Sequence, residues 1–235
     1  MAVFAFKDFR VRQENSPLKV STDAILLGAS VQLPSTTLKV LDVGTGSGVI
    51  ALLLASRYEN AQITGIDPDL GAFTDAQFNF LQSKFAQQLN AVQTALEDLP
   101  KDNTYDAIVS NPPYFLDSFA AQEATAQVAK HCSRQVFFNL LQDMCLRCND
   151  AGQIWLVLPP KLAQETQLYL QSMGWKCTQE IHFHANPRKL DKRWVVCFEK
   201  NIRKSTKADY FIRDLEGRYH ADYLQLAGVF HDRKL

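Results

Sequence analysis

Short apolar runs alternate along this chain with longer segments in which apolar residues recur every three or four positions. Runs rich in β-branched residues predict strands at 38–44, 61–67, 91–96, 105–110 and 153–159. Helical spacing predicts helices at 47–58, 70–89 and 135–149. Because strands that alternate with helices form βαβ units, we expect an α/β fold built on a mainly parallel sheet.

The pattern changes after the fifth predicted strand. One more helix is expected from about Leu162 to Met173, followed by two strand-like runs at 176–185 and 193–200 that a basic stretch joins. We expect this hairpin to add an antiparallel terminal strand to the sheet. No long linker or internal repeat interrupts the chain. We therefore expect a single domain over 1–235, with an N-terminal lead-in at 1–37, a core at 38–204 and a C-terminal tail at 205–235.

Composition narrows the class of protein. The chain is 46% hydrophobic, which is enough for a sizeable core, and its longest apolar run, VIALLLA, is far too short to cross a membrane. The first residues carry no signal-peptide pattern, and the five cysteines do not make a disulfide framework. Cys145 and Cys148 form a C-x-x-C without a second pair, so we expect no metal site. We expect a cytoplasmic protein that is a monomer and binds no membrane.

Basic residues concentrate late in the chain, although the net charge is zero. Residues 186–207 include eight basic residues and two acidic ones, a local charge of +6. This stretch is either a solvated loop and strand edge or a contact for nucleic acid. The N-terminal segment adds Lys7, Arg10, Arg12 and Lys19.

The segment LDVGTGSGVIAL places Gly44, Gly46 and Gly48 between the first strand and the first helix. Glycines let the backbone turn sharply and bring a ligand close to bare amides at a helix start. The G-x-G-x-G spacing differs from the dinucleotide fingerprint. The next strand ends in Asp67, whose carboxylate can accept both hydroxyls of a ribose. Asp98 follows the third strand, where an adenine amino group would reach. A nucleoside with an uncharged tail fits this set better than a pyrophosphate, and a merely structural turn is the alternative.

Several short motifs in this order and spacing resemble an S-adenosylmethionine-dependent methyltransferase of the Rossmann-like class I: DVGTGSG, GIDPD, LED and SNPPY. Four further stretches, KVSTDAILLGA, AKHCS, SMGW and GRYHADYLQLAGVF, narrow the likeness to the bacterial tRNA(Val) adenine-N6 methyltransferase family, from about Phe4 onward. The resemblance implies a class I methyltransferase fold, S-adenosyl-L-methionine as cofactor and tRNA as partner. It also implies methylation of the adenine just 3′ of the anticodon. The candidate cofactor-binding residues are Asp42, Gly44, Thr45, Gly46, Ser47, Gly48, Asp67, Asp98 and Asn111.

The segment VSNPPYF carries the candidate catalytic residues. The exocyclic amine of adenine is a poor nucleophile because its lone pair is delocalised into the ring. Two acceptors aimed at its hydrogens, the side-chain oxygen of Asn111 and the carbonyl of Pro112, would stabilise the positive charge that develops on nitrogen. Pro113 restricts the backbone of Pro112, and Tyr114 offers a flat face for an extruded base. The candidate catalytic residues are thus Asn111, Pro112 and Tyr114, and the candidate substrate-binding residues are Tyr114, Lys19, Arg188 and Lys192.

Three alternatives stay open from the sequence. In the first alternative, Asn111 has no catalytic role and only caps a turn after a strand. A glutamine-amide methyltransferase shares the NPPY motif, but such enzymes usually carry a helical N-terminal domain, for which 37 residues leave no room. A module that binds S-adenosylmethionine or RNA without catalysis would not need paired acceptors.

Overall fold

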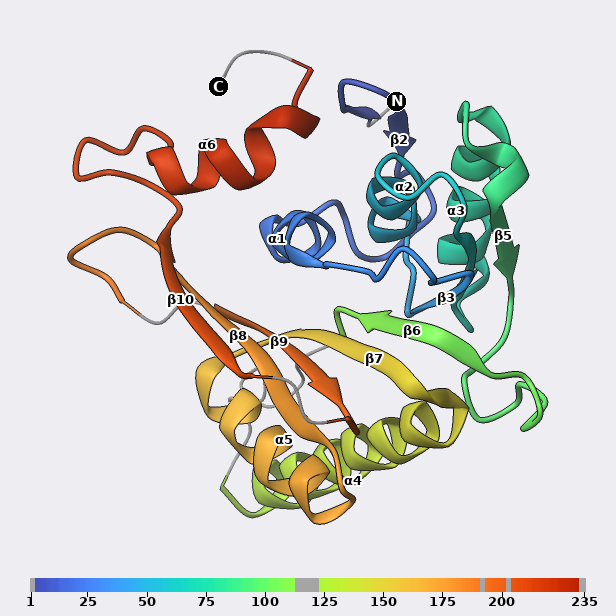
Figure 1. Ribbon diagram of the computed structural model, residues 1–235, viewed down its shortest axis with the longest axis vertical. Helices are drawn as coiled ribbons and strands as arrows, with labels where there is room; N and C mark the ends of the chain where they lie inside the picture. Colours follow the sequence, from blue (N-terminus) through green and yellow to red (C-terminus); the bar gives the residue numbers. More distant parts are fainter. Residues whose placement is uncertain (1–2, 113–122, 191–192, 202–203, 233–235) are drawn as a thin grey trace.

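The computed structural model describes residues 3–112, 123–190, 193–201 and 204–232 (Figure 1). Eight strands of these residues form one sheet, in the order β10-β8-β9-β7-β6-β3-β4-β5. Their bounds are β3 Lys39–Val43, β4 Gln62–Ile66, β5 Leu89–Val92, β6 Tyr105–Ser110, β7 Cys148–Leu158, β8 Lys176–His184, β9 Arg193–Glu199 and β10 Thr206–Phe211. All neighbouring pairs are parallel except those that β9 makes with β7 and β8. The mainly parallel α/β sheet with an antiparallel strand is therefore confirmed.

The helices connect these strands. Their bounds are α1 Thr22–Ser30, α2 Val49–Ala55, α3 Leu70–Gln82, α4 Glu123–Arg147, α5 Pro160–Ser172 and α6 Ala221–Ala227, with single 3₁₀ turns at Ala86–Gln88 and Gly228–Phe230. A small hairpin of β1 (Val3–Ala5) and β2 (Arg10–Arg12) precedes them. Within the described ranges, no helix is long and apolar enough to cross a membrane.

Two apolar cores lie on opposite faces of the sheet. Successive strand residues alternate between them, so that Val40 packs into one core and Leu41 into the other. Helices α1, α2, α3 and α6 cover the first face, and α4 and α5 cover the second (Figure 1). The molecule therefore has three layers, with helices on both faces of a parallel sheet.

The C-terminal tail contributes a strand to the sheet, which the sequence pattern does not predict. Strand β10 pairs in parallel with β8, so it forms the edge of the sheet and the β8–β9 hairpin lies inside it. The predicted third strand is also displaced, because β5 ends at Val92 and the chain then runs through turns to β6. The lead-in holds helix α1, which begins at the cap Ser21, whose hydroxyl accepts from the Ala24 N–H.

Candidate functional site

The register of three strands places the predicted site residues in one row. Val43 of β3 pairs with Ser110 of β6 on one side and with Ile66 of β4 on the other. The next residues along these strands are Gly44, Asn111 and Asp67. Because neighbouring strands lie about 4.8 Å apart, the glycine turn stands between the asparagine and the aspartate at the carboxyl edge of the sheet. The Ser110 hydroxyl, which donates to the Val43 carbonyl over 2.8 Å, fixes this register at its end.

The glycine turn is held by the last residue of β4 and by Asp67, which follows it. The N–H groups of Gly44 and Thr45 each donate to the Ile66 carbonyl over 2.9 Å. The N–H of Gly46 donates to Asp67 Oδ2 over 3.0 Å, and Asp67 Oδ1 accepts from the N–H of Asp69 over 3.0 Å. Partial burial raises the pKa of Asp67 above its ordinary value, although these two donors oppose the shift. Each Asp67 oxygen keeps a further lone pair, which leaves acceptors for a ligand.

Asp42 lies beneath the turn. Its fully buried carboxylate accepts from the Thr45 hydroxyl over 2.7 Å and from the Ala51 N–H, in the first turn of α2, over 3.2 Å. Burial raises its pKa to about 7, against the effect of these two donors. Gly65 makes room for Thr45, because a Cβ on Gly65 would stand 2.7 Å from the Thr45 Oγ1. Asp42 therefore shapes the loop from below, while Asp67 lies beside it.

A cavity of about 370 Å³ opens above the turn. Five short pieces of chain line it: the residues before α1, the first turn of α1, the glycine turn, the first turn of α2, and the two residues after β6. The lining residues that the sequence predicted are Lys19, Gly44, Thr45, Gly46, Ser47, Asn111 and Pro112. Gly44 has a positive φ of +69°, and a Cβ there would meet no heavy atom within 4 Å. The open space next to a bare backbone is what a nucleoside cofactor requires, so the residues present fit the expected group.

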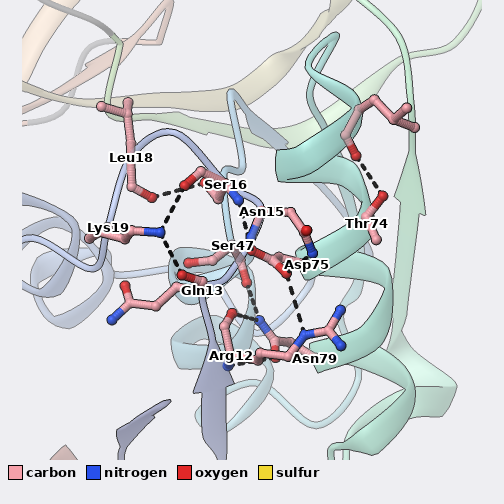
Figure 2. A network of polar contacts seen from close by, with 11 residues as sticks. Arg12, Gln13, Asn15, Ser16, Leu18, Lys19, Ser47, Thr74, Asp75 and Asn79 are labelled. Atoms are coloured by element: carbon pink, nitrogen blue, oxygen red, sulfur yellow. Dashed lines mark hydrogen bonds and ion pairs between the residues drawn. The ribbon is translucent and has the colours of Figure 1, made fainter. Parts of the chain in front are cut away.

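The segment of residues 12–20, which we call the strap, forms one wall of this cavity. Leu18, Lys19 and Val20 line it, and the Ser16 hydroxyl lies 3.9 Å from where a Cβ on Gly46 would stand. The strap runs between the glycine turn and α3 (Figure 2). Lys19 Nζ donates within the strap, to the carbonyls of Gln13 over 2.6 Å and Ser16 over 3.2 Å. The Lys19 ammonium, which we expected to contact substrate phosphates, thus forms hydrogen bonds within the strap.

The candidate catalytic residues are placed in part. Asn111 is half-buried and Pro112 is buried, and both line the cavity directly beside the glycine turn. Tyr114 and Pro113 lie outside the described residues. The geometry therefore brings the glycine turn and both residues that were predicted to supply acceptors, Asn111 and Pro112, to one cavity.

Five predicted residues are described by the structure but do not line the cavity: Asp42, Gly48, Asp67, Asp98 and Arg188. Asp98 is exposed in a turn beyond β5, and its N–H donates to the Ala95 carbonyl over 3.3 Å. Arg188 is exposed in the β8–β9 loop, and Lys192 lies outside the described residues. This loop nevertheless starts at the same edge as the cavity, because β8 runs in the direction of β7. Arg193 joins the two, since its Nε donates to Oδ2 of Asp23, a lining residue, over 2.6 Å.

Two buried polar residues of α3 escaped the sequence analysis. Asp75 and Asn79 are both buried and bind the strap. A signal for them exists in the sequence. The buried residues of α3 are Ala72, Asp75, Ala76, Asn79 and Phe80, the spacing of a single helix face. Polar residues at two positions of an apolar face indicate side chains with fixed partners.

Comparisons with known proteins agree with this geometry. The family model of the methyltransferase small domain matches residues 21–172. The chain is 33% identical to a tRNA1(Val) (adenine(37)-N6)-methyltransferase of Pedobacter heparinus over 97% of both chains. It is 30% identical to one of Haemophilus influenzae over 98% of this chain and 99% of that one. Among solved structures, a predicted O-methyltransferase from Agrobacterium tumefaciens has a TM-score of 0.66 at 17% identity, over 87% of this chain and 95% of that one. A methyltransferase from Pyrococcus furiosus has a TM-score of 0.59 at 20% identity, over 82% and 90%.

Proposed function

The chain belongs to the methyltransferase small domain family, and we propose that it transfers the methyl group of S-adenosylmethionine to N6 of an adenine in tRNA. The relatives that match it over nearly its whole length are named for adenine 37 of tRNA1(Val). We propose the same adenine here. Because tRNA is the substrate, we place the protein in the cytoplasm, and we propose that the lead-in, core and tail over 1–235 work as one domain.

One observation carries the catalytic part of the proposal: Asn111 and the glycine turn follow paired residues of adjacent strands and line one cavity. When bound, S-adenosylmethionine supplies an electrophilic methyl group. The glycine turn gives it bare backbone, and Asp67 offers carboxylate oxygens to the ribose hydroxyls. Asp98 is proposed as the partner of the adenine amino group of the cofactor.

Asn111 is proposed to act on the substrate. Its side-chain oxygen would accept a hydrogen bond from the target amine, and the Pro112 carbonyl would accept the second. Acceptors held in place before reaction would stabilise the positive charge that develops on the nitrogen during methyl transfer. The sulfur of the donor would keep the electron pair of its bond to the methyl group. The methylated nitrogen would be strongly acidic, because loss of its proton restores conjugation with the ring, and the proton would leave to water. Tyr114 is proposed as the stacking face for the base.

Recognition of tRNA is proposed to involve the basic β8–β9 loop. Arg188 is exposed there, and Arg193 anchors the end of the loop to α1 beside the cavity. Phosphates on either side of a splayed-out loop base would meet this surface. Lys192 is proposed to contribute to the same contact. Lys19 is proposed to contribute through its third N–H, since two N–H groups donate to carbonyls within the strap.

The test is a methylation assay with purified protein, S-adenosylmethionine and two acceptors, tRNA lacking the modification and a glutamine-containing protein. Mass spectrometry of the digested nucleosides should detect N6-methyladenosine at one position of the tRNA. Asn111→Ala should lower turnover by about a hundredfold or more, as for loss of one preorganised contact. Asn60→Ala is the matched control, because Asn60 is exposed before β4, at the opposite edge of the sheet.

Two outcomes would contradict the proposal. Methyl groups found only on protein glutamine would replace the substrate and leave the fold unaffected. Turnover of Asn111→Ala equal to that of Asn60→Ala would reduce Asn111 to a turn residue.

A further inference from the structure

Polar side chains of α3 bind residues 12–16 of the strap (Figure 2). Residues 12–16 run along this helix so closely that a Cβ on Gly71 would stand 2.4 Å from the Asn15 carbonyl oxygen. A larger residue at position 71 would push the strap away from the helix. The contact is therefore specific to this pair of segments.

Asp75 holds the middle of the strap. Its Oδ2 accepts from the backbone N–H groups of Asn15 and Ser16, each over 2.8 Å, and its Oδ1 accepts from the side-chain amide of Asn15 over 3.0 Å. Arg12 Nε lies 3.4 Å from the same Oδ1, an ion-pair contact rather than a hydrogen bond. The carboxylate is fully buried. Burial raises its pKa, but the donors from Ser16 and Asn15 and the charge of Arg12 outweigh that effect, so the net pKa is lowered.

Asn79, one turn further along α3, binds two walls of the cavity at once. Its Oδ1 accepts from the Arg12 N–H, and its Nδ2 donates to the Arg12 carbonyl, both over 2.8 Å. The same Nδ2 donates to the carbonyl of Ser47 in the glycine turn over 2.8 Å. One amide therefore fixes the strap relative to the turn that it faces.

We propose that Asp75 and Asn79 are positioning residues for the methyl donor, a latch that sets the strap at the distance from the glycine turn that the bound cofactor needs. The inference rests on the proposed function, because it concerns the same cavity. Neither side chain lines the cavity, so both act through the strap and the turn. A buried carboxylate with directed donors fixes geometry more narrowly than an apolar contact of equal area, which suits a wall that must be preorganised for its ligand.

The experiment compares Asp75→Ala and Asn79→Ala with Thr74→Ala. Thr74 directly precedes Asp75 on α3, and its hydroxyl donates to the Leu70 carbonyl of the same helix, over 2.6 Å. Calorimetry measures affinity for S-adenosylhomocysteine, the demethylated product. Hydrogen exchange measures protection of the Asn15 and Ser16 amides without any ligand. Initial rates over a range of S-adenosylmethionine separate KM from kcat.

The latch predicts a specific pattern. Both variants should bind S-adenosylhomocysteine at least tenfold more weakly than wild type. The Asn15 and Ser16 amides should exchange faster in Asp75→Ala. KM for the donor should rise, while kcat at saturating donor stays within about threefold of wild type. Thr74→Ala should match wild type in all of these measurements.

A milder variant protects the test against a failure to fold. Asn15→Ala removes one side-chain donor to Asp75 and leaves both backbone donors in place. It should bind the product between twofold and tenfold more weakly. Wild-type affinity in Asn15→Ala and Asn79→Ala, with faster exchange in the strap, would overturn the latch and leave the strap a purely structural segment. A wild-type protein that fails to bind S-adenosylhomocysteine would instead overturn the proposed function.

Discussion

Replacing Gly48 by alanine should lower the melting temperature of the protein, whereas replacing Gly44 by alanine should mainly weaken binding of the methyl donor. Both glycines lie in the same turn with positive φ, +83° and +69°. Their surroundings differ. A Cβ on Gly48 would stand 2.4 Å from Cε1 of Phe80, a buried residue of α3, while a Cβ on Gly44 would meet nothing within 4 Å.

The magnitudes follow from these two environments. A left-handed backbone costs a residue with a Cβ about 1–2 kcal/mol. Both variants should lose this much free energy of unfolding. Overpacking against Phe80 adds about 1–3 kcal/mol to Gly48→Ala only. At about 2–4 °C per kcal/mol for a domain of this size, Gly48→Ala should melt roughly 4–20 °C below wild type. In Gly44→Ala the new methyl group enters the cofactor cavity, so affinity for S-adenosylhomocysteine should fall at least tenfold, about 1.4 kcal/mol.

The assay is thermal unfolding followed by circular dichroism, paired with calorimetric titration of S-adenosylhomocysteine. Gly217→Ala is the matched control, because Gly217 has a φ of +84°, no heavy atom within 4 Å of an added Cβ and a place outside the cavity lining. It measures the backbone cost alone. Equal losses of melting temperature in Gly44→Ala and Gly48→Ala, or wild-type affinity in Gly44→Ala, would refute the reasoning.

Two further predictions concern charge. Because burial raises the pKa of Asp42 from 3.8 to about 7, its contribution to stability is fully present below pH 3.8 and is lost as pH rises through 7. Urea unfolding should therefore show wild type losing roughly 4 kcal/mol relative to Asp42→Asn between pH 4 and 8, and parallel profiles would contradict this. Arg188→Ala should flatten the dependence of log tRNA affinity on log salt by about 0.7–0.9 units without changing donor binding. Lys101 is exposed before β6, at the edge of the sheet opposite the cavity, so Lys101→Ala should leave the salt dependence unchanged. Equal slopes for the two variants would show that Arg188 does not contact the tRNA.

The parts of the site that local sequence encodes could be predicted. A run rich in β-branched residues that ends in glycines or an aspartate predicts a strand followed by a turn, and this prediction does not require knowledge of the neighbouring strands. The positions of Gly44, Asp67 and Asn111 at one edge follow from three such runs and the rule that parallel strands share their carboxyl ends.

The parts of the site that depend on contacts between distant residues could not be predicted from the sequence. The strap shows no apolar periodicity, and its order comes from Asp75 and Asn79, some 60 residues away in the chain. Strand β10 is at the edge of the sheet and all six of its residues are exposed or half-buried, so it lacks the buried apolar run by which the inner strands were predicted. The helical spacing predicts a helix at 70–89, and the two polar residues on its buried face, Asp75 and Asn79, are the sign of the strap that the sequence offers.

The two ends of the described chain lie against each other. Phe6 forms a β-bridge with His231, and the Lys7 N–H donates to the Phe230 carbonyl over 2.8 Å (Figure 1). This contact joins residues more than 220 positions apart in the chain, so a long loop must close for it to form. During synthesis the phenylalanines of the first hairpin emerge long before their partners. The strap follows directly after that hairpin. The segment that forms one wall of the cofactor cavity therefore begins next to a hairpin that the C-terminal tail contacts through backbone bonds.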